Sequence, residues 1–178
     1  MTHALTNNSR LLNGLKTNLQ KINVMKKLTT ILWILLVLAA IRVQATNAPV
    51  ATFGTVTSTG ITATVPITVT NFTDIGSYSL RFTFNPAIVS VTSVTQGPDL
   101  GGSINVNTSI SGQVSFSWYG TAGLTLSGTP VVANIVFSKV MSGTSALTFV
   151  DNGISCSWYN GSGTSLTDTP FASFYFPG

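Results

Sequence analysis

The strongest constraint on the fold is a stretch of apolar and polar alternation that runs from Ile61 to Pro86. Because successive side chains of a β-strand point to opposite faces of the sheet, alternation places the apolar side chains of each segment on one face. The other face carries Ser, Thr and Arg81, which is typical of half-buried antiparallel strands and not of the fully apolar strands of a parallel sheet. We therefore predict that residues 61–70 and 77–84 form two strands that pair with each other in one layer of a β-sandwich. The inward set is Ile61, Ala63, Val65, Ile67 and Val69 in the first strand and Tyr78, Leu80, Phe82 and Phe84 in the second.

The net charge of +4 comes from the first 45 residues and not from the body of the chain. Six of the eight Lys and Arg residues precede residue 46, so residues 46–178 carry only Arg81 and Lys139 against four aspartates, a net charge of −2. A surface that binds nucleic acid needs clustered cations that displace counterions from the phosphates. Two isolated cations do not supply such a surface, and we exclude nucleic acid as a partner.

Residues 25–45 have the features of a secretory signal peptide. Two lysines follow Met25, an apolar run covers residues 28–41, and Val43-Gln44-Ala45 is a small-residue cleavage site. The run has 14 residues, whereas a membrane-spanning helix needs roughly 20, so export is favoured over the alternative of a membrane anchor. We predict a start at Met25, cleavage near Ala45, no membrane insertion of the mature chain, and a secreted or cell-surface location.

The chain then divides into an N-terminal extension with its signal peptide, residues 1–45, and one all-β domain, residues 46–178. Turn-forming residues recur at short, even intervals in this domain, no segment shows a sustained helical period, and its length suits one full core. Asn85-Pro86 favours a single helical turn, residues 104–110 an edge strand, and the continuously apolar residues 131–140 a central strand. We expect about nine antiparallel strands in a sandwich, drawn from ten candidate segments at residues 49–56, 61–70, 77–84, 89–95, 104–110, 113–119, 131–140, 146–150, 154–159 and 171–176, with loops at 120–128 and 161–170.

The order of these segments resembles the cohesin domain family. The resemblance spans about Pro49 to Phe176. It rests on the strand ITATVPITVTNF, a strand from Gly76 that ends in Phe-Asn-Pro at Pro86, an apolar strand at 113–119, a Gly-led strand at 128–137 followed by Lys139 to Gly143, and a closing strand. The resemblance implies the nine-stranded jelly roll of cellulosomal scaffold modules. It also implies a non-catalytic secreted module that binds dockerin modules on polysaccharide-degrading enzymes, with a fold shared by related carbohydrate-binding modules.

The resemblance places the dockerin contact on one sheet face, where cohesins commonly use polar residues such as Asn and Asp on the third strand. The corresponding positions here are Ser77 and Ser79, and serine keeps a donor and an acceptor but loses the charge and the reach. A solvated face without a partner is the alternative, because one polar face is normal for an antiparallel sheet. Arg81 and Tyr119 favour an interface, since both residue types are enriched there. The family fold implies that the two strands are neighbours, and the candidate partner-binding residues are Ser77, Ser79, Arg81 and Thr83 on one and Ser115, Ser117 and Tyr119 on the other.

A repeated Ser-x-Ser-Trp-Tyr pattern at residues 115–119 and 155–159 offers a second candidate site. Alternation sends each Trp inward and leaves Tyr119 and Tyr159 at the surface, where an aromatic ring with a hydroxyl suits the apolar side of a sugar. A polysaccharide platform drawn from Tyr119, Trp158 and Tyr159 requires Tyr119, Tyr159 or Trp158 to be exposed on one surface. The stronger interpretation places the tryptophans in the sandwich core.

The residue inventory of the body argues against an enzyme, a metal site or a cofactor. The body contains no His and no Glu, and its four Asp residues lie in separate predicted loops, so no two carboxyls face one bond as a glycosidase requires. Cys156 has neither a basic partner nor a second Cys, which favours a buried apolar role. Asp151-Asn152-Gly153 is explained as a tight turn. Three functions stay open: a cohesin-like protein-binding module, a carbohydrate-binding module, and a structural or adhesive cell-surface domain.

Overall fold

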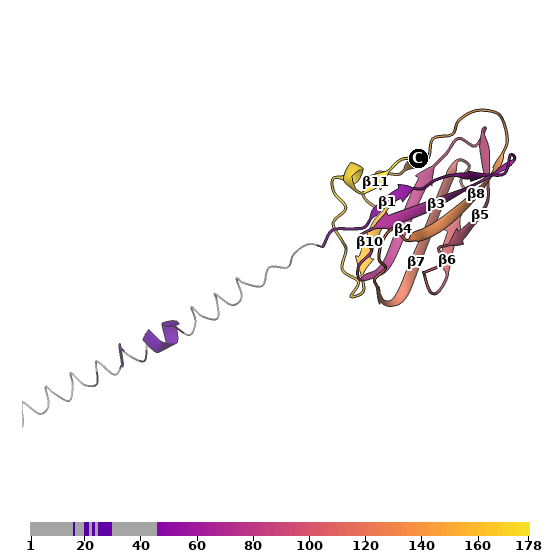
Figure 1. Ribbon diagram of the computed structural model, residues 1–178. Helices are drawn as coiled ribbons and strands as arrows, with labels where there is room; N and C mark the ends of the chain where they lie inside the picture. The colour runs from indigo at the N-terminus through magenta and orange to yellow at the C-terminus, as the bar shows by residue number, and fades with distance from the viewer. Residues whose placement is uncertain (1–15, 17–19, 22, 24, 30–45) are drawn as a thin grey trace, which may run out of the picture. The chain divides into compact units, whose positions relative to one another are not determined.

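The computed structural model describes residues 16, 20–21, 23, 25–29 and 46–178 (Figure 1). Residues 25–29 are helical. Most of the expected signal peptide, residues 30–45 with the cleavage site, lies outside the described residues. Within the described part of the chain, none of the helices has the length and apolar character needed to cross a bilayer.

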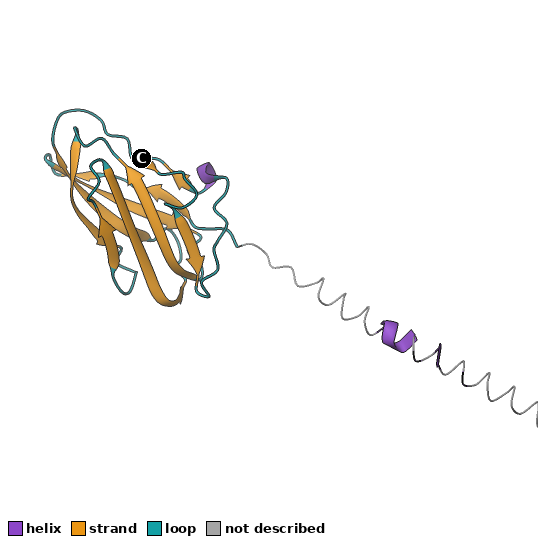
Figure 2. Ribbon diagram, turned by 180° about the vertical axis from the view of Figure 1, so that it is seen from behind, coloured by secondary structure: helices purple, strands orange, loops and turns teal. Residues whose placement is uncertain are grey.

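Two β-sheets make up residues 46–178, and strands joined by loops account for nearly the whole body (Figure 2). The β3–β8 sheet has the order β11-β1-β3-β8-β5, with β2 also paired to β3. The β4–β7 sheet has the order β10-β4-β7-β6, with β9 also paired to β4. The bounds are β1 (Val50–Phe53), β2 (Thr57–Ser58), β3 (Thr62–Thr70), β4 (Ile75–Thr83), β5 (Val89–Gln96), β6 (Ile104–Asn107), β7 (Gln113–Leu124), β8 (Val131–Lys139), β9 (Thr148–Phe149), β10 (Ser157–Asn160) and β11 (Tyr175–Phe176).

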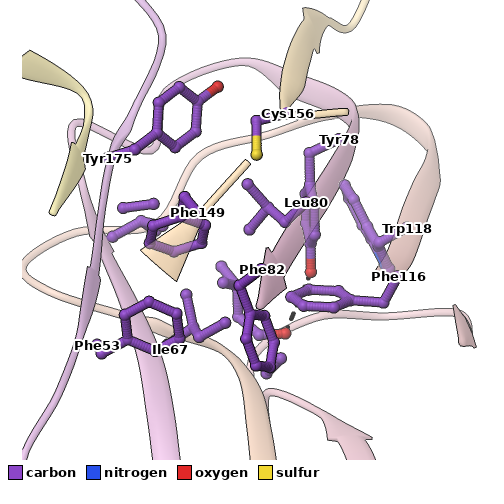
Figure 3. Packing of buried hydrophobic residues seen from close by; sticks show 14 of the residues in the cluster. Phe53, Ile67, Tyr78, Leu80, Phe82, Phe116, Trp118, Phe149, Cys156 and Tyr175 are labelled. Atoms are coloured by element: carbon purple, nitrogen blue, oxygen red, sulfur yellow. Dashed lines mark hydrogen bonds between the residues drawn. The ribbon is translucent and has the colours of Figure 1, made fainter. Parts of the chain in front are cut away.

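The inward-facing residues of both sheets meet in one core, which confirms the predicted sandwich. Alternation along β4 buries Tyr78, Leu80 and Phe82, and alternation along β7 buries Phe116 and Trp118. Figure 3 shows these side chains gathered in one cluster. Aromatic rings fill its centre, where the ring of Tyr78 lies 4.9 Å from that of Trp158 and 5.7 Å from that of Trp118, measured between centroids. Such aromatic pairs contribute beyond the apolar area that they bury.

The prediction that the segments 61–70 and 77–84 pair with each other is wrong. The first segment, β3, pairs with β1, β2 and β8, whereas the second, β4, pairs with β7, β9 and β10 in the other sheet. The chain crosses between the layers at residues 71–74, where Asn71 (φ 60°) and Asp74 (φ 53°) both adopt the left-handed conformation and Phe72 is buried between them. Alternation specifies which face of a strand is buried, but it does not specify the strand's neighbour.

Several expected strands have different limits in the structure. Eleven strands are present in the described residues where about nine were expected, partly because the segment 49–56 is divided into β1 and β2. The expected loop at 120–128 is strand as far as Leu124, and the closing segment begins with a 3-10 turn, η1 (Phe171–Ser173), before β11 pairs parallel to β1. Ile61, expected inward, precedes β3 and is 76% exposed.

Three other local predictions are confirmed. The side-chain oxygen Oδ1 of Asn85 accepts a hydrogen bond from the backbone N–H of Ala87 at 3.0 Å, which holds the single turn expected there. Strand β6 lies at an edge of its sheet, and β8 lies between β3 and β5 in the other. The expected core thus forms, and the polar sides of β4 and β7 are left facing solvent.

Candidate functional site

The seven candidate partner-binding residues lie together on the outer face of the β4–β7 sheet. Strands β4 and β7 are antiparallel neighbours, as the family fold implies. Their register pairs the candidates across the sheet in three rows: Ser77 with Tyr119, Ser79 with Ser117, and Arg81 with Ser115, while Thr83 is opposite Gln113. The juxtaposition of these residues is therefore observed, and their role in binding stays a prediction.

The two flanking strands widen this face with residues that the sequence analysis did not select. On β6, Asn105 is opposite Ser117 and Asn107 is opposite Ser115. On β10, Ser157 is opposite Ser79. The alternation of Ile104 and Val106 with these asparagines marks the outward side of β6. The signal that could have found them is the short connection at residues 108–112, in which Gly112 has φ 76°, because consecutive strands joined by so few residues commonly pair as a hairpin.

A shallow hollow of about 460 Å³ lies over the middle of this face. Its walls carry hydroxyl and amide groups, among them those of Ser79, Asn105, Asn107 and Ser155, and Arg81 is the one charged residue that lines it. The Nε–H group of Arg81 donates a hydrogen bond of 2.9 Å to the hydroxyl of Ser115. This bond fixes the plane of the guanidinium group, which is half-buried in the sheet face.

The loop between β9 and β10 forms one wall of the hollow and has the expected turn. The Oδ1 atom of Asn152 accepts hydrogen bonds from the backbone N–H groups of Ile154 (3.1 Å) and Ser155 (2.8 Å). Ile154 also lines the hollow and is 81% exposed. An exposed apolar side chain beside a polar hollow is a feature that protein interfaces use, and the sequence analysis missed it because Ile154 was assigned to a strand.

Tyr119 and Tyr159, the two tyrosines of the repeated pattern, lie on this same face, but Trp158 does not. Tyr119 is 73% exposed and Tyr159 is 38% exposed, and both are opposite Ser77, one on each side of β4. Since neighbouring strands are about 4.8 Å apart, the two backbones are separated by about 10 Å. Trp158 is fully buried against Tyr78, so its proposed place on a sugar platform is wrong, and the core interpretation of the tryptophans is confirmed.

Acidic side chains do not gather into a site in the described residues. No group of three or more His, Cys, Asp or Glu side chains lies together there. Asp168 accepts a hydrogen bond of 2.8 Å from the hydroxyl of Tyr175, and Asp74 is exposed at the crossing between the sheets.

Cys156 is buried directly beneath the candidate face. Its side chain is 4% exposed, and its Sγ atom lies 3.4 Å from the backbone oxygen of Arg81 on β4. Burial raises the pKa of this thiol to about 11. A thiol with such a pKa is protonated at neutral pH and is a poor nucleophile, which agrees with the apolar role expected from the sequence.

The buried thiol of Cys156 predicts a loss of stability at alkaline pH. The pKa of Cys156 is raised from 9.0 to about 11, so from pH 9 upward the unfolded chain releases this proton before the folded chain does. The stabilisation is complete below pH 9 and is lost as the pH rises to 11. We expect the free energy of unfolding to fall by about 2 kcal/mol from this group, measured by urea denaturation at pH 8, 9, 10 and 11.

A Cys156→Ala variant is the control for this effect. It lacks the thiol and should lose less stability between pH 9 and 10 than the unchanged chain. The buried hydroxyls of Tyr78 and Tyr175, whose pKa values burial also raises, remain in the variant. They lower the free energy of unfolding only above about pH 10, where a tyrosine of the unfolded chain ionises. Identical slopes for both proteins between pH 9 and 10 would contradict the assignment to Cys156.

Comparison with known proteins gives one family and a set of similar folds. The family model described as Cohesin domain matches residues 50–172. A search of curated protein sequences gave no match.

Three solved structures illustrate the structural similarity. A type I cohesin–dockerin complex from Clostridium thermocellum matches with a TM-score of 0.58 and 17% identity, over 74% of this chain and 96% of the other. A non-cellulosomal cohesin from the archaeon Archaeoglobus fulgidus matches with a TM-score of 0.57 and 18% identity, over 75% and 88%. The sixth cohesin of scaffoldin B from Acetivibrio cellulolyticus, solved in complex with a dockerin, matches with a TM-score of 0.57 and 14% identity, over 68% and 92%. At these identities the likeness concerns the fold.

Proposed function

The chain belongs to the cohesin domain family, and from this premise we propose that residues 46–178 form a non-catalytic module that docks a dockerin-type module on a polysaccharide-degrading enzyme. The proposed contact is the outer face of the β4–β7 sheet, which we call the docking face. It comprises the outward residues of four strands: Ser77, Ser79, Arg81, Thr83, Asn105, Asn107, Ser115, Ser117, Tyr119, Ser157 and Tyr159.

One observation carries this proposal: the residues singled out from the sequence meet on a single continuous face. Small hydroxyl side chains at its middle, Ser79 and Ser117, let the backbone of a partner approach closely. Tyr119 at one end and Ile154 beside the hollow expose the larger side chains that interfaces favour. Two of the similar structures described above are complexes with dockerins, which supports a partner of the same class here.

Export fits this function and is part of the proposal. The signal peptide expected at residues 25–45 would deliver the module to the medium or the cell surface, where polysaccharide-degrading enzymes act. Membership of a cellulosome is a narrower statement, because one of the similar structures is described as non-cellulosomal. We propose an extracellular docking role and leave the identity of the larger assembly to experiment.

The proposal is tested with the purified chain on a biosensor surface and a panel of purified dockerin modules. We expect saturable binding of at least one dockerin, and we expect Tyr119→Ala to weaken this binding about tenfold, because an exposed aromatic at an interface typically contributes 1–2 kcal/mol. Thr64→Ala, on the outer face of the opposite sheet, is the matched control and should bind normally. Unchanged binding by Tyr119→Ala would remove this residue from the contact.

A carbohydrate-binding module is the second candidate, and the exposure of both tyrosines in one row favours it. In that case the chain should bind to insoluble cellulose or xylan, and Tyr119→Ala combined with Tyr159→Ala should abolish the retention. Binding of a dockerin without retention on polysaccharide supports the first function. If neither ligand binds, the structural or adhesive role is left.

A further inference from the structure

The docking face has one charged group, Arg81, and this group has no acidic partner within the described residues. Its Nε–H donates a hydrogen bond of 2.9 Å to the hydroxyl of Ser115. The terminal Nη groups have no hydrogen-bond partner in the part of the chain that the structure describes. Asp151 belongs to the loop that walls the hollow, but it does not line the hollow and forms no ion pair with Arg81.

The surroundings of Arg81 are suited to an anion. The hollow is lined by neutral polar groups, so its guanidinium charge is not cancelled locally. Half-burial in the sheet reduces the screening of this charge by water. The bond to Ser115 holds the group in one plane, and a fixed guanidinium presents its remaining N–H donors as a fork that matches the two oxygens of a carboxylate.

The charge count limits the anion to a single negative charge. Lys139, the other cation of residues 46–178, ends β8 in the opposite sheet and does not line the hollow. A phosphate carries about −1.5 to −2 at neutral pH and is usually held by several cations. One guanidinium flanked by hydroxyl and amide groups fits a carboxylate better. Asn105 and Asn107, whose side chains carry amide N–H donors, also line the hollow.

We propose that Arg81 is a specificity-determining residue that receives an Asp or Glu carboxylate of the partner protein in the hollow of the docking face. This inference rests on the proposed function and adds that the partner presents a carboxylate to Arg81. The module would then discriminate among dockerins by the presence of an acidic side chain at the position that faces Arg81.

The direct test uses two capped tripeptides as probes, acetyl-Gly-Asp-Gly-amide and acetyl-Gly-Asn-Gly-amide, titrated into the ¹⁵N-labelled full chain. We expect the Asp peptide to shift the Nε–Hε signal of Arg81 and to bind about tenfold more tightly than the Asn peptide, as charge-assisted hydrogen bonds predict. Arg81→Gln should remove this preference. Lys139→Gln, the same charge change on the opposite sheet, should retain it.

Other results of the titration would overturn the inference. These are equal shifts by the two peptides, a preference that survives in Arg81→Gln, or tighter binding of inorganic phosphate than of the Asp peptide. The amide spectrum of each variant shows whether the sandwich is folded, and Arg81→Lys tests whether charge without the planar fork gives only part of the preference.

A second experiment separates this inference from the proposed function. Dockerins that bind the unchanged chain are measured against Arg81→Gln, with each Asp and Glu of the dockerin replaced in turn by its amide. We expect Arg81→Gln to weaken binding by about tenfold to hundredfold, and one dockerin amide variant to show no further loss in that background. Equal binding of dockerins by Arg81→Gln would overturn the carboxylate contact and leave the docking function intact. A preference for the Asp peptide without any dockerin binding would support the carboxylate contact and overturn the docking function.

Discussion

A Ser79→Trp variant is expected to bind dockerin about 100-fold more weakly than the unchanged chain, or worse, while its sandwich stays folded. Ser79 lies in the middle of the docking face, between Ser157 on β10 and Ser117 on β7. All three side chains are small, so a partner can lie close to the sheet. An indole ring at this position stands above the face and holds the partner away from Arg81, the hollow and the neighbouring strands at once. Loss of close contact at the centre of an interface costs about 2.7 kcal/mol or more, which corresponds to a hundredfold change in affinity.

The matched control for this variant is Asn134→Trp. Asn134 is half-buried on the outward side of β8, in the middle of the opposite sheet. The same increase in side-chain size there should leave dockerin affinity within about twofold of the unchanged chain. Calorimetric titration of both variants with one dockerin makes the comparison, and the melting temperature of each shows that neither is unfolded. An equal loss of affinity in the two variants, or a loss in Asn134→Trp alone, would place the contact elsewhere.

The second large effect is on stability: Trp158→Ala should lower the free energy of unfolding by about 3–5 kcal/mol. Trp158 is fully buried, and its ring lies 4.9 Å from that of Tyr78 and 6.2 Å from that of Phe72, between centroids. Removing the indole leaves a cavity at the centre of the aromatic cluster, which the rigid sheets can fill only in part. A domain of this size typically has a total stability of about 5–15 kcal/mol, so the variant should lose a large fraction of the stability of the domain.

The neighbouring residue supplies the control. Tyr159→Ala removes a ring of similar size from the outer face, where the side chain is 38% exposed, and should cost less than about 1 kcal/mol. Urea denaturation followed by tryptophan fluorescence or circular dichroism gives both values. If the two variants lose similar amounts of stability, the burial of the Trp158 side chain in the core is contradicted.

Much of the fold could be predicted from local sequence because alternation is a direct consequence of strand geometry. In β4 and β7 the period of two identified the inward side chains correctly, including Tyr78 and Trp118. The same period identified Ser79, Ser117 and the other outward residues before any pairing was known. For this reason the face of each of the seven candidate partner-binding residues was right even where the limits of its strand were not.

The pairing of strands could not be predicted in the same way. Residues 61–70 and 77–84 are adjacent in sequence and both alternate, yet the left-handed residues Asn71 and Asp74 carry the chain across the core into the other sheet. A strand with one apolar face fits either sheet of the sandwich. The sheet that it joins depends on contacts with residues that are far away in the sequence. The sequence resemblance to cohesins supplied the correct neighbour for β4, since it implied the contact with β7.

The candidate site was predicted in part for the same reason. The residues of β4 and β7 were found because their own alternation marks them. Asn105 and Asn107 were missed because the hairpin that joins β6 to β7 through residues 108–112 was not inferred. The hollow could not be predicted, because its lining comes from β4, β6, β7 and the loop before β10 together. The contact between Arg81 and Ser115 likewise follows from register between strands that are more than 30 residues apart.

The most direct test of the central claim is a map of the surface that a bound dockerin covers. In a cross-saturation NMR experiment, the dockerin is irradiated and the loss of signal is recorded for each amide of the labelled chain. We predict that the losses concentrate on β4, β6 and β7, around Ser79, Asn105 and Ser117. Losses confined to the outer face of the β3–β8 sheet, or a chain that binds none of the dockerins, would contradict the account.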